Sequence, residues 1–103
     1  MHRNIERTAR FGLGNKIDGL FLDLLEFLRK AVYAPIDKKI IILAYASDKV
    51  DALRFFMQLL WESRFVSNEQ YTAIAGEIEN IGRIIGGWRK DLLNKTSAKT
   101  PVK

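Results

Sequence analysis

The 103-residue sequence contains no cysteine, one histidine and only two prolines. Without cysteine there is no disulfide framework, no thiolate metal site and no cysteine nucleophile, and His2 alone excludes a multi-histidine metal centre. Seven glycines and two prolines are too few for a turn-rich β-protein of this length. The most apolar run, 40–46, is far shorter than the roughly 20 residues that cross a bilayer. No signal peptide is recognisable, so we expect a cytoplasmic protein.

The composition is that of a globular domain with basic ends. Hydrophobic residues make up 48% of the chain, too many for a disordered protein, and the length allows one domain. The net charge is +5, but residues 1–16 carry +3, residues 17–88 carry −2 and residues 89–103 carry +4. Basic ends on a near-neutral body favour a polyanionic partner. The alternative interpretation is that the basic residues only keep the protein soluble and have no binding partner.

Apolar residues recur at three- and four-residue steps in three long segments, which predicts an all-α chain. The first segment runs from about residue 7 to residue 33. It ends there because the residue before Pro35 avoids the α region. Its apolar stripe consists of Leu13, Ile17, Leu20, Leu24, Phe27 and Ala31.

The second segment runs from about residue 37 to residue 64, with Asp37 as the expected N-cap. Its heptad-like seam consists of Leu43, Ala46, Val50, Leu53, Met57 and Leu60. A second apolar line on the opposite face, broken by Asp48, consists of Ile41, Tyr45, Ala52, Phe55 and Leu59. A helix that is apolar on two faces must be covered twice, so this line predicts contact with a further helix or another subunit.

The third segment has a clear start signal. Ser67 and Gln70 are spaced for a capping box, and Val66 and Tyr71 for a hydrophobic staple. We expect the helix to end near residues 93–94. Its seam consists of Tyr71, Ile74, Ile78, Ile81, Ile85, Trp88 and Leu92.

These segments predict an antiparallel up-and-down bundle of three long helices over residues 1–94, followed by a flexible basic tail over residues 95–103. Helices of about 27 residues are about 40 Å long. Three such helices form a thin bundle that leaves apolar surface uncovered. We therefore expect a homo-oligomer.

Glycines and tryptophans invite more than one interpretation. The stretch 12–16, Gly-Leu-Gly-Asn-Lys, fails the spacing of a phosphate-binding P-loop, and we expect it to form a tight helix entry. Gly82 and Gly86 share one helix face and predict close approach of another backbone. Trp61 and Trp88 could stack on bases. Trp88 lies on the seam, which favours packing.

The sequence contains no nucleophile–base pair, metal constellation or cofactor fingerprint, so we predict no enzyme, no cofactor and no metal site. The basic residues late in the third segment remain as binding candidates. A negative helix C-terminus also favours cations there, which is the competing structural explanation.

Three stretches together resemble a known family. They are residues 10–14, Arg-Phe-Gly-Leu-Gly, with Lys16 after them; Leu53 with Arg54; and residues 79–88, with an Ile-Gly-Arg and a Gly-Gly-Trp. Over roughly residues 9–93 the chain resembles the four-helix-bundle family of Avd, the accessory variability determinant of diversity-generating retroelements. Relatives are encoded by intervening sequences in bacterial large-subunit ribosomal RNA genes.

The resemblance implies a basic homopentameric barrel with no activity of its own. It implies an accessory protein that docks the retroelement reverse transcriptase and template RNA or cDNA during mutagenic retrohoming. A structural homo-oligomerisation bundle of unknown role, as in the ribosomal RNA insertions, is the alternative. Family members carry a full helix before the Arg-Phe-x-Leu-Gly stretch, whereas nine residues precede Arg10 here. We expect that helix to be short or missing, or supplied by another subunit.

Candidate residues follow from the charge pattern and the resemblance together. Those expected to bind nucleic acid or the partner are Arg10, Lys16, Arg54, Arg83, Arg89, Lys90, Lys95 and Lys99. Those expected to serve packing or oligomer contacts are Tyr45, Phe55, Leu59, Gly82, Gly86 and Trp88.

Overall fold

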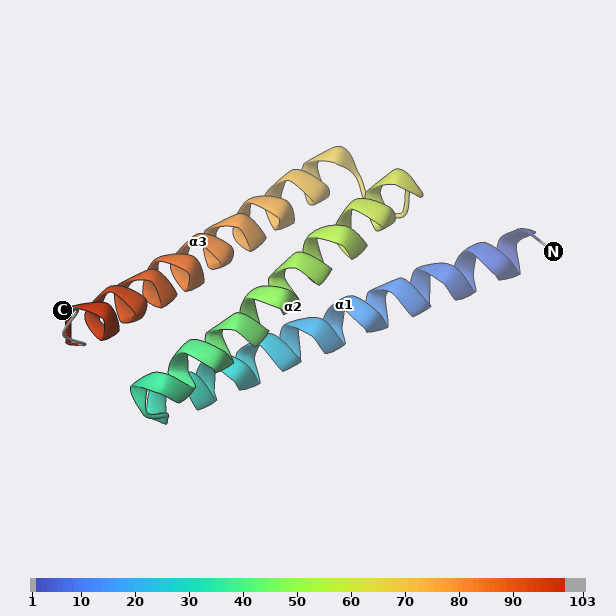
Figure 1. Ribbon diagram of the computed structural model, residues 1–103. Helices are drawn as coiled ribbons and strands as arrows, with labels where there is room; N and C mark the ends of the chain where they lie inside the picture. The colour runs from blue at the N-terminus through green and yellow to red at the C-terminus, as the bar shows by residue number, and fades with distance from the viewer. Residues whose placement is uncertain (1, 100–103) are drawn as a thin grey trace.

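In the computed structural model, which describes residues 2–99 and the side chains of residues 8–96, the chain forms a bundle of three long helices (Figure 1). The helices are α1 (His2–Tyr33), α2 (Ile36–Glu62) and α3 (Asn68–Lys99). No strand occurs in this range, so the all-α prediction is confirmed. The molecule is elongated, with extents of 66 × 21 × 20 Å.

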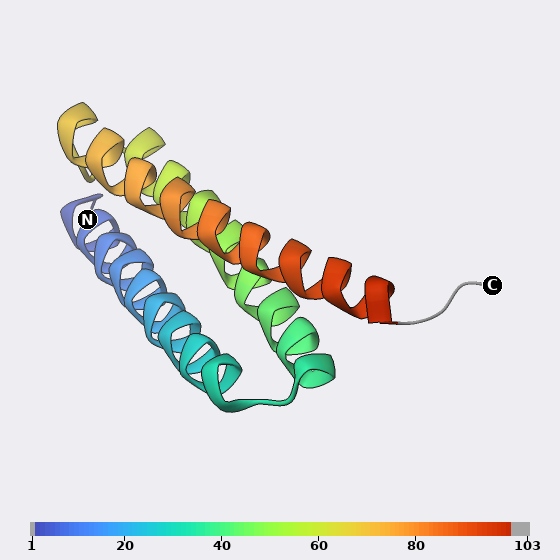
Figure 2. The ribbon, with the colours of Figure 1, turned by 90° about the vertical axis from the view of Figure 1, so that its left-hand side faces the viewer.

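The central helix α2 holds the molecule together. It packs along both α1 and α3, whereas no Cα atom of α1 comes within 8 Å of one in α3 over the described residues. Figure 2, a quarter turn away, shows α3 crossing α2 while α1 runs along the other side. The start of α1 and the end of α3 lie at opposite ends of the molecule (Figure 1).

Helix α1 begins earlier than its apolar pattern predicted, at His2 rather than near residue 7. Gly12 and Gly14 therefore lie inside the helix, and the predicted tight helix entry at 12–16 is wrong. A glycine inside a helix lowers its stability by up to about 1 kcal/mol relative to alanine. Helical residues on both sides of Gly12 and Gly14 keep the helix continuous despite this cost. The end at Tyr33 agrees with the prediction made from Pro35.

Helix α2 starts one residue before the predicted cap. Pro35 occupies the N-cap position in an extended conformation (φ −61°, ψ 159°), and its carbonyl accepts the first helical hydrogen bond from Lys39 N at 2.7 Å. The predicted cap at Asp37 is wrong, because this residue lies in the first turn. A carboxylate there still interacts favourably with the positive end of the helix dipole.

The C-terminal end of α2 closes with a Schellman motif instead of continuing to Arg64. Phe65 N donates to Leu60 O at 3.0 Å, and Arg64 N donates to Trp61 O at 2.9 Å. Arg64 has a φ of 63°, the left-handed conformation that this motif requires. Glycine usually occupies the position because an L side chain is disfavoured there.

The predicted capping box of α3 is confirmed. Gln70 N donates to Ser67 Oγ at 3.0 Å, and Ser67 N donates to the Gln70 side-chain oxygen at 2.9 Å. The helix extends to Lys99, so the predicted end at residues 93–94 is wrong. Residues 95–99 of the predicted flexible tail continue the helix, because no helix breaker occurs before Pro101. The rest of that tail lies outside the described residues.

The core lies along the predicted seams. All six seam residues of α2 are buried, and they meet buried residues from both flanking helices. The contributors from α1 and α3 are Ile17, Leu20, Leu24 and Ala31, and Ile78, Ile85 and Leu92. Ile74, predicted to join the α3 seam, is exposed.

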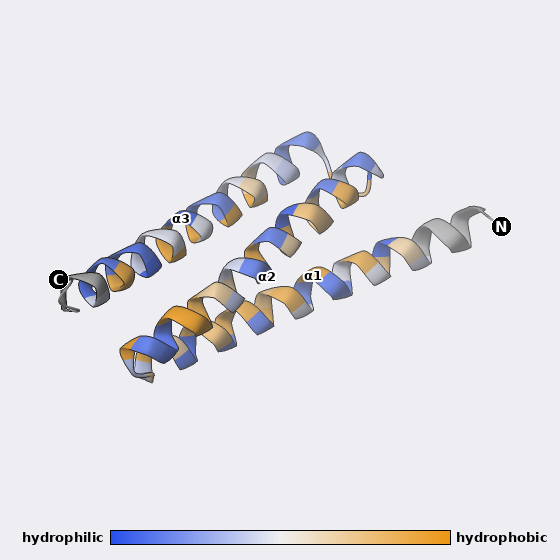
Figure 3. Ribbon diagram, in the orientation of Figure 1, coloured by the Kyte–Doolittle hydropathy of each residue, from blue (hydrophilic) through white to orange (hydrophobic). Residues whose placement is uncertain are grey.

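Apolar residues recur along all three helices, as the orange segments of Figure 3 show, and many of their side chains are exposed in the single chain. On α2, four residues of the second apolar line are exposed: Ile41, Tyr45, Phe55 and Leu59. On α1, exposed apolar residues include Phe11, Leu22 and Leu25. Within the described residues, Phe27 of α1 stacks on Tyr45, and most of this apolar surface is left exposed.

Candidate nucleic-acid interface

Three helices are joined by one lysine at the end of the bundle where α1 turns into α2. Lys39 Nζ donates to the carbonyl oxygens of Ala31, at 2.7 Å, and Val32, at 2.8 Å. The same ammonium lies 5.9 Å from the ring centroid of Trp88 in α3. It thus adds a strong donor to carbonyls in the last turn of α1, of which Ala31 O also accepts from Ala34 N at 3.4 Å, and it places a cation at the negative end of α1.

Further cations lie close in sequence to Lys39 or to Trp88, the ring that its ammonium approaches. We call the basic end the set Lys30, Lys38, Lys39, Arg89, Lys90 and Lys95. All of them except Lys39 are exposed, and they come from all three helices. The carboxylates of Asp37 and Asp91 lie in the same segments, so cations outnumber acids there. Exposed ammonium and guanidinium groups at this density are suited to contact phosphates.

A neighbouring arginine is excluded from this set because it is already paired. Arg29 donates to both carboxylate oxygens of Glu26, one turn away on α1. This hydrogen bond lowers the pKa of Glu26 and raises that of Arg29. The pair contributes no net charge to the surface.

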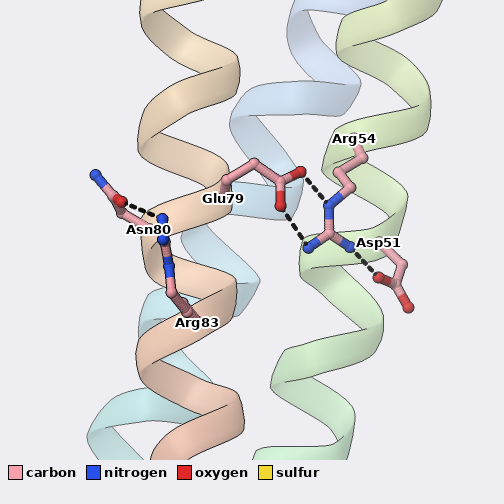
Figure 4. Close-up of polar contacts among 5 residues, drawn as sticks. All are labelled: Asp51, Arg54, Glu79, Asn80 and Arg83. Carbon is pink, nitrogen blue, oxygen red and sulfur yellow. Dashed lines mark hydrogen bonds and ion pairs between the residues drawn. The ribbon is translucent and has the colours of Figure 1, made fainter.

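Arg54 is also engaged, in a cluster between α2 and α3 (Figure 4). Its Nε donates to Glu79 Oε2 at 2.6 Å and its Nη2 to Glu79 Oε1 at 3.2 Å, while Nη1 donates to Asp51. The hydrogen bond from Arg54 lowers the pKa of Glu79, and that of Arg54 is raised. Two carboxylates thus neutralise one guanidinium, so Arg54 links two helices and offers no free charge.

Gly82 provides the space for this link. A Cβ atom at Gly82 would lie 3.0 Å from Arg54 Nη2 and 3.2 Å from Val50 Cγ1, so α3 approaches α2 closely at this point. A Cβ at Gly86 would meet nothing within 4 Å. Within the chain, close packing therefore involves Gly82 and not Gly86. Arg83, next in sequence, donates instead to Asn80 Oδ1 at 2.7 Å and points away from Arg54 (Figure 4).

The predicted binding residues of α1 lie far from the basic end. Arg10 is exposed near the start of α1, where it lines an open hollow with Phe11 and Asp18. Lys16 Nζ lies 5.7 Å from the ring centroid of Phe56. Arg89, Lys90 and Lys95 belong to the basic end, whereas Arg54 and Arg83 line a hollow with Glu79 and Gly82. The other two candidates, Arg10 and Lys16, lie nearer the start of α1. The side chain of Lys99 lies outside the described ones.

Sequence reasoning missed Lys30, Lys38 and Lys39. They lie in the segment whose overall charge is slightly negative, so counting charge along the chain conceals them. Only the turn at residues 34–35 and the packing of α3 place them beside Arg89 and Lys90. The sequence did contain one indication of this surface, because Lys30, Lys38 and Lys39 all lie close to that turn.

Neither tryptophan presents a free stacking platform. The Trp61 ring stacks on Tyr71, with centroids 4.7 Å apart and an interplanar angle of 14°, and its Nε1 donates to Asn68 Oδ1 at 2.6 Å. Trp88 is half-buried under Lys39. Both rings therefore serve packing within the chain.

The described part of the chain has a small hollow between α2 and α3 and larger, open hollows at its surface, one of them about 790 Å³ beside Arg10 and Phe11. The hollow between α2 and α3, lined in part by Met57, Tyr71 and Ile78, has a volume of about 170 Å³. Typical small-molecule sites have volumes of about 300–1,000 Å³.

Among the described side chains, no three histidines, cysteines or carboxylates gather as metal ligands would. None of the described helices combines the length and apolarity needed to cross a bilayer.

Comparison with known proteins adds no relative: no family model, curated protein or solved structure matches the chain.

Proposed function

We propose that the chain is a non-enzymatic nucleic-acid-binding protein, built as an antiparallel up-and-down helical bundle that assembles into a homo-oligomer. The basic end carries the proposal, because cations from three separate helices converge there and most are free of carboxylate partners. The exposed second apolar line of α2 supports self-association. The sequence motifs at residues 10–16 and 79–88 support a more specific role, as an accessory protein that docks a retroelement reverse transcriptase with its template RNA or cDNA.

Binding at the basic end would be electrostatic. Lysine and arginine side chains contact phosphates and release condensed counterions, so affinity depends strongly on salt and weakly on base sequence. Lys39 has a different task in this arrangement. It fixes the helices that carry its neighbours, since two of its three donors are used by main-chain carbonyls.

The test compares two triple variants of equal charge by fluorescence anisotropy, with mixed-sequence RNA and DNA over a range of salt. One variant replaces Lys30, Arg89 and Lys90 by alanine. The second variant replaces Arg10, Lys16 and Arg64, which lie outside the basic end. Because Arg10 and Lys16 are themselves candidates from the sequence, this variant sets the two groups of candidates against each other. Loss of three phosphate contacts lowers the slope of log affinity against log salt by about 3 in the first variant. Equal weakening by the two variants, or no weakening by the first, refutes the assignment.

A structural oligomerisation bundle is the second candidate, and the exposed apolar line of α2 favours it. Such a protein would self-associate and ignore nucleic acid. Light scattering for mass, beside the binding assay, separates the two functions. The same measurement distinguishes the ring of five copies that the family resemblance implies from smaller assemblies.

A further inference from the structure

The outer face of α2 carries a regular stripe that the described part of the chain leaves largely uncovered. Its positions alternate in steps of three and four, the spacing of a helix–helix seam. We call the outer stripe the set Ile41, Tyr45, Asp48, Ala52, Phe55 and Leu59, with Lys38 and Glu62 as its two ends. Tyr45 is 57% exposed and Phe55 is 62% exposed, although Phe27 of α1 stacks on Tyr45.

The outer stripe reads nearly the same in both directions from its centre near residue 50. Ile41 and Leu59 are equidistant from the centre, as are Tyr45 and Phe55. Asp48 corresponds to Ala52, and the ends, Lys38 and Glu62, carry opposite charges. A stripe with this symmetry is complementary to an inverted copy of itself, which is the requirement for a two-fold interface.

We propose that the outer stripe of α2 pairs with the same stripe of a second copy, the two α2 helices running in opposite directions about a two-fold axis near residue 50. This inference rests on the proposed self-association and names its contact surface. Ile41 then meets Leu59 of the second copy, and Tyr45 meets Phe55, at both ends of the contact. Aromatic pairs of this kind stabilise beyond their buried area.

Charge decides the direction of pairing. In the inverted arrangement, Lys38 faces Glu62 of the second copy twice, and each Asp48 faces an alanine. In a parallel arrangement, Lys38 would face Lys38, Glu62 would face Glu62, and the two Asp48 carboxylates would meet between apolar neighbours. Like charges at such positions destabilise the pairing, so the inverted arrangement is selected.

The inverted pairing has a consequence for nucleic-acid binding. The basic end lies at the N-terminal end of α2, so two antiparallel copies present their basic ends at opposite extremities of the assembly. One dimer therefore offers two separated phosphate-binding surfaces. In each surface Lys38 pairs with Glu62 of the second copy, and the other cations of the basic end remain for phosphates.

Cysteine cross-linking tests the direction, because the natural chain has no cysteine. Ile41→Cys and Leu59→Cys proteins, distinguished by mass tags, are mixed and oxidised. A disulfide needs Cα atoms within about 7 Å. In the inverted arrangement positions 41 of the two copies are about 27 Å apart along the helices. The expected product is therefore the mixed 41–59 dimer, with little 41–41 product. Predominant 41–41 and 59–59 products would overturn the inverted direction.

Interface variants test the location of the contact. Phe55→Glu is expected to raise the dissociation constant of self-association about 100-fold or more, measured by analytical ultracentrifugation. Leu22→Glu, at a similarly exposed apolar position on α1, is the matched control and is expected to leave it unchanged. If both substitutions weaken self-association equally, or if only Leu22→Glu weakens it, the contact does not lie on the outer stripe.

These outcomes remain separable from the proposed function. A chain that is monomeric at all concentrations overturns both the stripe contact and the proposed self-association, while salt-dependent binding of RNA by that monomer preserves the nucleic-acid role. A multimer of five copies without 41–59 cross-links overturns the stripe contact alone.

Discussion

Lys39→Met tests whether one ammonium group fastens the end of the bundle. Methionine is also long, unbranched and apolar over much of its length, so packing against Trp88 is largely kept while the charge and its donors are lost. The lost contacts are the hydrogen bonds to Ala31 O and Val32 O and the approach to the Trp88 ring. The variant therefore measures the electrostatic part of the contact.

The magnitude follows from three overlapping terms of the same charge. A hydrogen bond to a charged group contributes about 1.5–3 kcal/mol net. A cation at a helix C-terminus contributes about 0.3–1 kcal/mol, and a cation over an aromatic ring contributes about 0.5–1 kcal/mol at an exposed site. Because water can solvate the freed carbonyls at the half-buried site, we expect a loss of about 2 kcal/mol. For a domain of this size, that lowers Tm by about 10 °C.

The assay is thermal and urea unfolding followed by circular dichroism, at one fixed protein concentration because self-association adds to stability. Lys90→Met, an exposed lysine of the same basic end, is the control and is expected to change the unfolding free energy by less than about 0.5 kcal/mol. Equal effects of the two substitutions would refute the assignment of Lys39 as the fastening residue.

Three further predictions concern α2 and α3. Arg64→Gly should stabilise the chain by about 1 kcal/mol in urea unfolding, since glycine adopts the left-handed conformation of residue 64 without strain; a loss of stability would contradict this. Gly86→Ala should stabilise by about 0.5–1 kcal/mol because its Cβ meets open space, whereas Gly82→Ala should gain less or destabilise because its Cβ presses on Val50 and Arg54; equal gains would disprove the close approach. The lowered pKa of Glu79 means that its ion pair stabilises the fold above pH 4.5 and that this stabilisation is lost as the pH falls through the folded-state value. The Tm difference between the natural chain and Glu79→Gln should therefore shrink below pH 4.5, and a constant difference would exclude the linkage.

The elements that sequence reasoning predicted best are those fixed by local chemistry. Ser67 and Gln70 form the expected capping box because both hydrogen bonds lie within one turn. The seam from Leu43 to Leu60 is buried as expected because its three- and four-residue steps define one face of a helix. Such features depend on residues close in sequence.

The features that sequence reasoning missed depend on which of several nearby residues caps a helix, or on contacts between residues far apart in sequence. Asp37 is a good N-cap by residue type, but Pro35 already holds the extended conformation of an N-cap, so the helix starts two residues earlier than a cap at Asp37 implies. Arg54 resembles a free cation in sequence, but Glu79 lies 25 residues away and meets it only when α3 packs on α2. The basic end likewise exists only after two chain reversals.

The packing of α2 against both neighbours, with α1 and α3 kept apart, also bears on how the chain acquires its structure. Every close helix pair in the described part of the chain joins segments that are consecutive in sequence, so each pair forms by folding back at one short turn. Topologies with such local contacts fold in microseconds to milliseconds. Either hairpin can therefore form first, and the remaining helix then completes the core by docking on α2.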